Sequence, residues 1–157
     1  MIDLKKDLDL FFERQAEIKK SANELSDKVD LKIMEFIKDK VTPAFEEIKA
    51  ELLTRGRKVE TIITRFSAML IISTAEKTEL SLNIKLNKSG KTAYAVPIRE
   101  IVDRKKGQIF TSQGVFRSGS QNYTIEELTK DELVKYIIGQ YKDSLGAILL
   151  SEISESK

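Results

Sequence analysis

The chain of 157 residues contains no cysteine, no histidine and no tryptophan, and only two prolines. Without cysteine it has no disulfide framework, no thiolate nucleophile and no zinc–thiolate site. Without histidine it lacks the commonest general base and transition-metal ligand, which excludes Ser-His-Asp and Cys-His catalysis. We therefore expect no catalytic residues, no metal site and no cofactor.

Long hydrophobic runs are also absent. The longest apolar stretch, Ala68–Ile72, is far too short to span a bilayer, and the N-terminal residues 1–7 include acidic side chains and no signal-peptide core. A composition of 41% hydrophobic and 33% charged residues is typical of a folded protein, and this length suits one domain. The sequence therefore predicts a cytoplasmic, soluble chain with no membrane partner.

Charge is segregated along the chain. Residues 55–117 hold 13 Lys/Arg and 5 Asp/Glu, whereas residues 1–54 hold 10 and 13, and residues 118–157 hold 4 and 7. A basic middle segment indicates either a surface for an acidic partner, nucleic acid included, or a positive charge that offsets the acidic flanks of the same chain. We favour the second, because it accounts for the basic middle and the acidic flanks together, and the pI of 8.6 also lies below the usual nucleic-acid footprint of about 9. The candidate binding residues for a partner or nucleic acid are Arg55, Arg57, Lys58, Lys88, Lys91, Arg104, Lys105, Lys106 and Arg117.

Near the N-terminus, seam residues recur at alternating spacings of four and three, which is a heptad pattern. It predicts a long amphipathic helix within a helical arm at 1–54. The stripe either packs against the chain's own body, as one arm of a helical hairpin for example, or forms an intermolecular coiled coil; the pattern favours neither. The candidate self-association residues are Leu4, Leu8, Phe11, Gln15, Ile18 and Leu25. Gln15 is the polar member, suited to fixing register or oligomer number.

Two interruptions are predicted in this helical region. Ser26–Asp30 has the residues of a helix break, with Asp27 or Asp30 as a cap for a second helix. Pro43 predicts a kink, or a new helix capped by Thr42. Gly56 stands where a left-handed C-terminal cap is expected.

The period then changes to two, which indicates strands. Lys58–Ile63 is the predicted first strand, Asn87–Gly90 a hairpin turn, and Gln108–Thr111 with Val115–Arg117 a second, weaker hairpin. We expect the sheet to have one covered face and one polar, wet face. The alternating residues assigned to the core face are Phe66, Ala68, Leu70, Ile72, Leu80, Leu82, Ile84, Leu86, Thr92, Tyr94, Val96 and Ile98.

Tandem capping boxes at Thr124–Glu127 and Thr129–Glu132 open the last part of the chain. The second starts a final helix whose apolar stripe is expected to cross the sheet. The fold class is therefore α+β: long N-terminal helices, an antiparallel sheet of about four to six strands, and a C-terminal helix on one sheet face. Residues 55–157 form a single compact domain in this interpretation.

The predicted function is non-catalytic. We expect a macromolecular interaction module that self-associates into a homo-oligomer through its N-terminal helices and binds a protein partner, as a small adaptor or inhibitor of the kind found among bacterial and phage accessory proteins. The alternative is a nucleic-acid-binding protein that uses the basic central sheet. An enzyme is disfavoured, because adjacent carboxylates such as Glu46 and Glu47 point about 100° apart on a helix.

Overall fold

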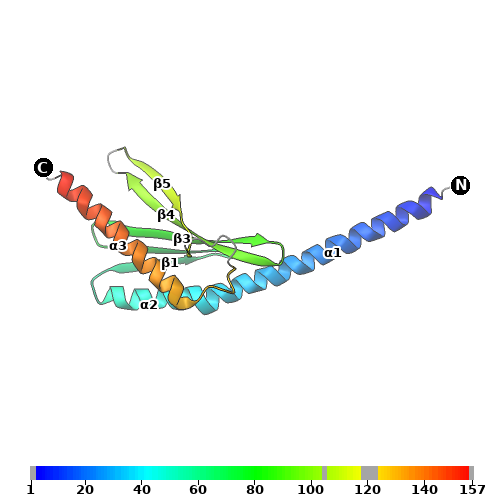
Figure 1. The fold of residues 1–157 in the computed structure, drawn as a ribbon, viewed down its shortest axis with the longest axis horizontal. Helices are drawn as coiled ribbons and strands as arrows, with labels where there is room; N and C mark the ends of the chain where they lie inside the picture. Colours follow the sequence, from blue (N-terminus) through cyan, green and yellow to red (C-terminus); the bar gives the residue numbers. More distant parts are fainter. Residues whose placement is uncertain (1–2, 104–105, 118–123, 156–157) are drawn as a thin grey trace.

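The computed structural model describes residues 3–103, 106–117 and 124–155 and has an α+β fold (Figure 1). A layer of helices covers one face of a five-stranded antiparallel sheet, and one end of the first helix projects far beyond this body. The predicted fold class is confirmed, and the number of strands lies within the expected range.

The N-terminal helices form one uninterrupted helical path. Helix α1 (Leu4–Phe36) passes into a π-helical turn, η1 (Ile37–Val41), and then into α2 (Thr42–Leu53). The predicted break at Ser26–Asp30 is therefore wrong, because the amphipathic pattern carries the helix through its capping-type residues. Gly56 follows the last helical turn with a φ of 76°, the left-handed conformation expected there.

The π-helical turn has a local cause in Pro43. Proline has no N–H to donate, and inside an α-helix its ring crowds the carbonyl four residues earlier. Here the N–H of Thr42 donates to the carbonyl of Ile37, five residues back, which widens the turn ahead of the proline. The prediction of Thr42 as a helix cap is wrong, since its φ of −59° is helical.

The five strands follow one another in sequence order and all pair antiparallel. They are β1 (Lys58–Ile63), β2 (Ser67–Ser73), β3 (Thr78–Ser89), β4 (Thr92–Asp103) and β5 (Gln108–Gln113). The first strand has the predicted bounds. The predicted strand at residues 115–117 is wrong, because β5 pairs with β4 and the chain leaves the sheet at residue 114.

The register of β4 differs from the prediction by one residue. Ser89 pairs with Thr92 across a two-residue loop, and this loop length turns the small residues of β4 towards the helices. A shift of one residue moves every side chain of a strand to the other face. The helix-facing residues are Ala93, Ala95 and Pro97, all buried. Tyr94, Val96 and Ile98, predicted for the core, lie on the opposite face.

The core lies between the sheet and the helical layer of α2, α3 (Lys130–Glu155) and the C-terminal third of α1 (Figure 1). The predicted capping box is present: the N–H of Glu132 donates to Thr129 Oγ1 at 3.2 Å. Helix α3 crosses the sheet as predicted, burying Leu133, Ile137 and Tyr141. Small residues on β4 let this layer approach closely.

Candidate interaction surfaces

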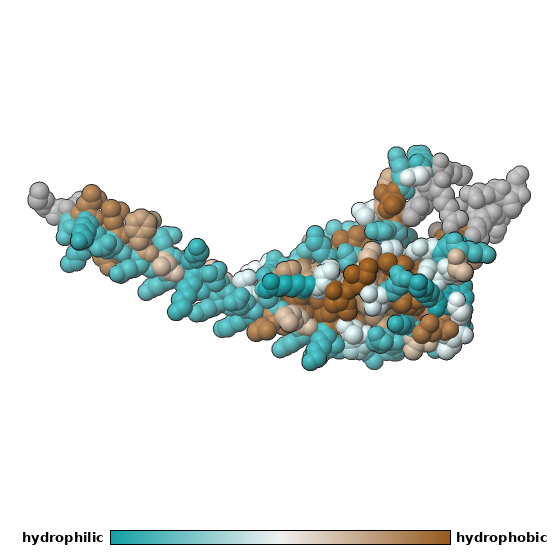
Figure 2. Space-filling view, turned by 180° about the vertical axis from the view of Figure 1, so that it is seen from behind, coloured by the Kyte–Doolittle hydropathy of each residue, from teal (hydrophilic) through white to brown (hydrophobic). Residues whose placement is uncertain are grey.

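The most conspicuous surface is the projecting end of α1. Every residue from Leu4 to Glu24 is exposed, and we call this segment the arm. At 1.5 Å per residue it is about 30 Å long. Its hydrophobic side chains gather towards the far end (Figure 2). Leu4, Phe11 and Ile18 of the stripe are 67%, 53% and 63% exposed, so no described part of the body covers the stripe.

The bare stripe continues the buried stripe of the same helix. With 100° per residue, Leu8, Phe11 and Ile18 lie on the side of α1 that, further along, buries Val29 and Ile33 under the sheet. The sheet ends where the arm begins. The arm therefore presents to solvent the same kind of surface that the body covers with β-strands.

An ionic cluster holds the base of the arm. Asp30 on α1 is buried and forms ion pairs with Arg65, at 2.8 Å, and with Lys88. The hydrogen bond from Lys88, followed by the nearby charges, lowers the pKa of the Asp30 carboxyl. Both cations also lie over the ring of Phe66, at 5.2 and 4.9 Å. These contacts join α1 to the β2 and β3 ends and fix the direction of the arm.

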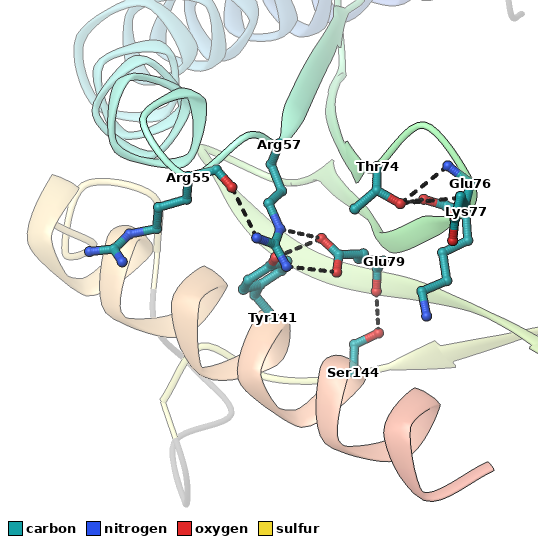
Figure 3. Close-up of polar contacts among 8 residues, drawn as sticks. All are labelled: Arg55, Arg57, Thr74, Glu76, Lys77, Glu79, Tyr141 and Ser144. Atoms are coloured by element: carbon teal, nitrogen blue, oxygen red, sulfur yellow. Dashed lines mark hydrogen bonds and ion pairs between the residues drawn. The ribbon is translucent and has the colours of Figure 1, made fainter. Parts of the chain in front are cut away.

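A second buried carboxylate, Glu79, lies near the opposite end of the β2–β3 pair, and Figure 3 draws its polar contacts. Glu79 Oε1 accepts from Arg57 Nε at 3.1 Å and from the Tyr141 hydroxyl at 2.7 Å, and the Ser144 hydroxyl donates to the Glu79 carbonyl. The register between β2 and β3 shifts beside Ser73, and this irregularity accompanies the inward position of the Glu79 side chain, as β-bulges redirect side chains. Burial raises the pKa of the Tyr141 hydroxyl, and Glu79 raises the pKa of Arg57. The cluster joins the α2–β1 loop, β3 and α3, so we interpret it as structural.

None of the described helices covers the other face of the sheet, which we call the open face (Figure 1). This surface is less polar than predicted, because it carries the β4 side chains that the register turns outward. Its apolar residues include Ile62, Met69, Ile71, Val96, Ile98 and Ile109. A hollow of about 670 Å³ on it is lined by Asn83, Lys85, Ile98, Glu100 and Thr111, with Thr64–Ser67 at its margin.

Among the described residues, the cations of the basic middle segment are dispersed over the molecule rather than gathered on the open face. The open face carries Lys58 and Lys85, with Glu60 and Glu100 on the same side. Most of the candidate binding cations form ion pairs within the chain. These pairs are Arg55–Glu51, Arg57–Glu79, Lys58–Glu60, Lys88–Asp30 and Arg117–Glu132.

Of the remaining candidate cations, two lie within the described residues. Lys91 is exposed in the loop between β3 and β4, and Lys106 is exposed near the start of β5. Arg104 and Lys105 lie outside the described residues. Within the described parts of the chain, no group of three or more acidic side chains could hold a metal ion, and no helix is long and apolar enough to cross a membrane.

Comparison with known proteins adds no relative. No family model matches the chain, and neither the curated proteins nor the solved structures contain a match. The α+β fold, the bare arm and the open face are therefore the features from which function has to be argued.

Proposed function

We propose that the chain is a non-catalytic interaction module that self-associates through its arm and binds a protein partner on the open face, in the manner of a small adaptor or inhibitor. The observation that carries the proposal is the arm itself. Its heptad stripe is bare over Leu4–Ala22, whereas the same stripe is buried from Val29 onward.

Covering this stripe is energetically favourable. Burying a Leu, Ile or Phe side chain contributes about 1.5–3 kcal/mol. A helix of this length also gains most of its stability from packing its apolar face rather than from intrinsic propensity. A second arm supplies the knobs and holes that a heptad stripe accepts.

The arm's own body is a poor alternative cover. Helix α1 is continuous through Ser26–Asp30, so the stripe reaches the body only if the helix breaks. The Asp30 cluster with Arg65 and Lys88 opposes such a break, because it fixes the helix to two strand ends. These observations favour a second copy over an intramolecular hairpin.

Partner binding is assigned to the open face because of its chemistry. It combines half-buried apolar side chains with a hollow and with nearly balanced charge, which suits a protein surface better than a phosphate backbone. Five of the nine candidate cations form ion pairs in the described parts of the chain, which disfavours the nucleic-acid alternative. Self-association would present several copies of a weak surface and raise the avidity for a partner.

The test is the mass in solution, measured by light scattering at low micromolar concentration. We expect the wild type to be an oligomer and the Leu8→Asp/Phe11→Asp variant to be a folded monomer with an unchanged sheet by circular dichroism. The matched control, Leu10→Asp/Ala16→Asp, adds the same two charges to exposed positions off the stripe and should keep the wild-type mass. A stripe variant that keeps the wild-type mass, or a monomeric wild type, would refute self-association through the arm.

A further inference from the structure

Within the described parts of the chain, strand β5 forms an unpaired edge of the sheet. It pairs with β4 and lies at the end of the strand order, and its residues Gln108–Gln113 are all exposed. They include no charged residue and no proline, the two residue classes that usually blunt an edge. The opposite edge, β1, carries Lys58 and Glu60, which form an ion pair at 2.8 Å. The β5 edge is thus the one suited to accept another strand.

The hydrogen-bond ladder shows which backbone groups are available. The Gly114 N–H donates to the Pro97 carbonyl at 2.9 Å, and this pair lies in the register that joins β4 to β5. Backbone groups alternate in direction along an antiparallel strand. Phe110 and Ser112 therefore point their N–H and C=O groups towards β4, while Ile109 and Thr111 point theirs away from the sheet.

We propose that β5 pairs antiparallel with β5 of a second copy, about a two-fold axis that passes beside Phe110. In this register Ile109 of each chain exchanges both backbone hydrogen bonds with Thr111 of the other. The two Phe110 residues then face each other as a non-hydrogen-bonded pair, the arrangement that brings side chains closest. The two sheets become one continuous sheet.

The strand that pairs with β5 comes from a second copy in this proposal, because β5 is self-complementary. Phe110 is 48% exposed, and its cross-strand partner on β4, Ile101, is 40% exposed. The two-fold pairing joins both residues of each chain into one apolar cluster. A register centred one residue later would instead place Phe110 opposite Ser112 and lose the aromatic pair. No charge on Gln108–Gln113 opposes the approach of an identical strand.

This contact is independent of the arm, and a single six-residue strand makes it the weaker of the two. It is therefore tested by cross-linking at high protein concentration, in the Leu8→Asp/Phe11→Asp background, where arms do not associate. Because the chain has no cysteine, each variant carries one thiol. We expect Phe110→Cys to form a disulfide-linked dimer on mild oxidation, since about 4.5 Å between Cα atoms suits a disulfide.

Ile109→Cys is the matched control on the neighbouring residue. Ile109 is more exposed than Phe110, at 66%, so random collision would favour cross-linking at residue 109. In the proposed register the two residues 109 are diagonal, about 7–8 Å apart, too far for a disulfide. Because Phe110→Cys removes the aromatic pair, a mixture of Ile109→Cys and Thr111→Cys chains, which keep Phe110 and are directly paired in this register, is also expected to link. Equal or greater cross-linking of Ile109→Cys alone, cross-linking of Thr111→Cys alone, or no dimer from the mixture would each overturn the proposal. The mass in solution of the Leu8→Asp/Phe11→Asp variant separately tests whether the arm mediates self-association.

Discussion

Two buried carboxylates, Asp30 and Glu79, tie the helical layer to the sheet at its two ends. Asp30 joins α1 to the strand ends near the arm, and Glu79 joins β3 to α3 near Gly56. Both have cationic partners, as buried carboxylates require. Neither can be found from sequence alone, because the Asp30–Arg65 and Arg57–Glu79 partners lie 35 and 22 residues apart.

The Asp30 cluster makes stability depend on pH. Because its folded pKa is lowered, the stabilising contribution is present above the unfolded pKa and is lost as the pH falls through the folded value. We expect Asp30→Asn to melt a few degrees below the wild type at pH 7, with the difference shrinking below about pH 4. Thermal melts followed by circular dichroism, at steps of about one pH unit from pH 3 to pH 7, measure this difference in melting temperature.

Asp27→Asn is the control for this change, since it makes the same chemical substitution at an exposed position on the same helix. A gap between wild type and Asp30→Asn that persists unchanged at the lowest pH would contradict the ionic explanation. The loss would then come from packing around residue 30 rather than from its charge.

Residue-level prediction failed most clearly on β4. Alternation assigns Thr92, Tyr94, Val96 and Ile98 to the core because they are the larger residues, yet Ala93 and its helix-facing neighbours are the buried ones. Alternation identifies the two faces of a strand but not which one meets the helices. The loop between Ser89 and Thr92 and the close helical layer decide that here, and neither is visible in the pattern.

Among the elements, the helices and strands with a strong period were predictable. The bounds of β1, the cap at Thr129 and the crossing of α3 are confirmed. Breaks were not predictable, because capping-type residues at Ser26–Asp30 are overridden by the apolar stripe that runs through them. The β5 partner was also missed. Asp103 pairs with Gln108, so β5 forms its hairpin with the preceding strand β4, whereas the sequence suggested a hairpin with residues 115–117.

Gln15 is the polar member of the arm stripe, and its replacement tests how the arms meet. If arms pair through this stripe, Gln15→Leu replaces a polar seam group with an apolar one. We expect the monomer–dimer dissociation constant to fall by at least about tenfold, which corresponds to about 1.4 kcal/mol. Analytical ultracentrifugation over a concentration series measures it.

Glu17→Leu serves as the matched control, because it adds the same side chain on the outer side of the arm. The two variants have similar helix propensity, so a difference between them reports the stripe. Equal tightening in both variants would indicate nonspecific hydrophobic association and would argue against a defined seam.

The placement of the body limits how two arms can meet. The stripe lies on the side of α1 that the sheet covers from Val29 onward. In a parallel pair the two α1 helices would face each other along the stripe over their whole length. The sheet of each chain would then have to fit between two helices that are only about 10 Å apart. An antiparallel pair avoids the conflict, since each arm tip ends beside the other chain's body and the two bodies lie at opposite ends.

Antiparallel pairing of the bare segments places Leu8 beside Ile18 of the second copy, because full overlap of residues 4–22 brings these seam positions level. We expect a disulfide-linked dimer when Leu8→Cys and Ile18→Cys chains are mixed and oxidised, and little dimer from either variant alone. A parallel pair predicts the reverse, with Leu8→Cys linking to itself, and non-reducing electrophoresis separates the two patterns.

Because α1 is one uninterrupted helix from Leu4 to Phe36, the orientation of the two arms also sets the distance between the two open faces. An antiparallel result would place the open faces at opposite ends of a rod, so that a dimer could bridge two partner molecules.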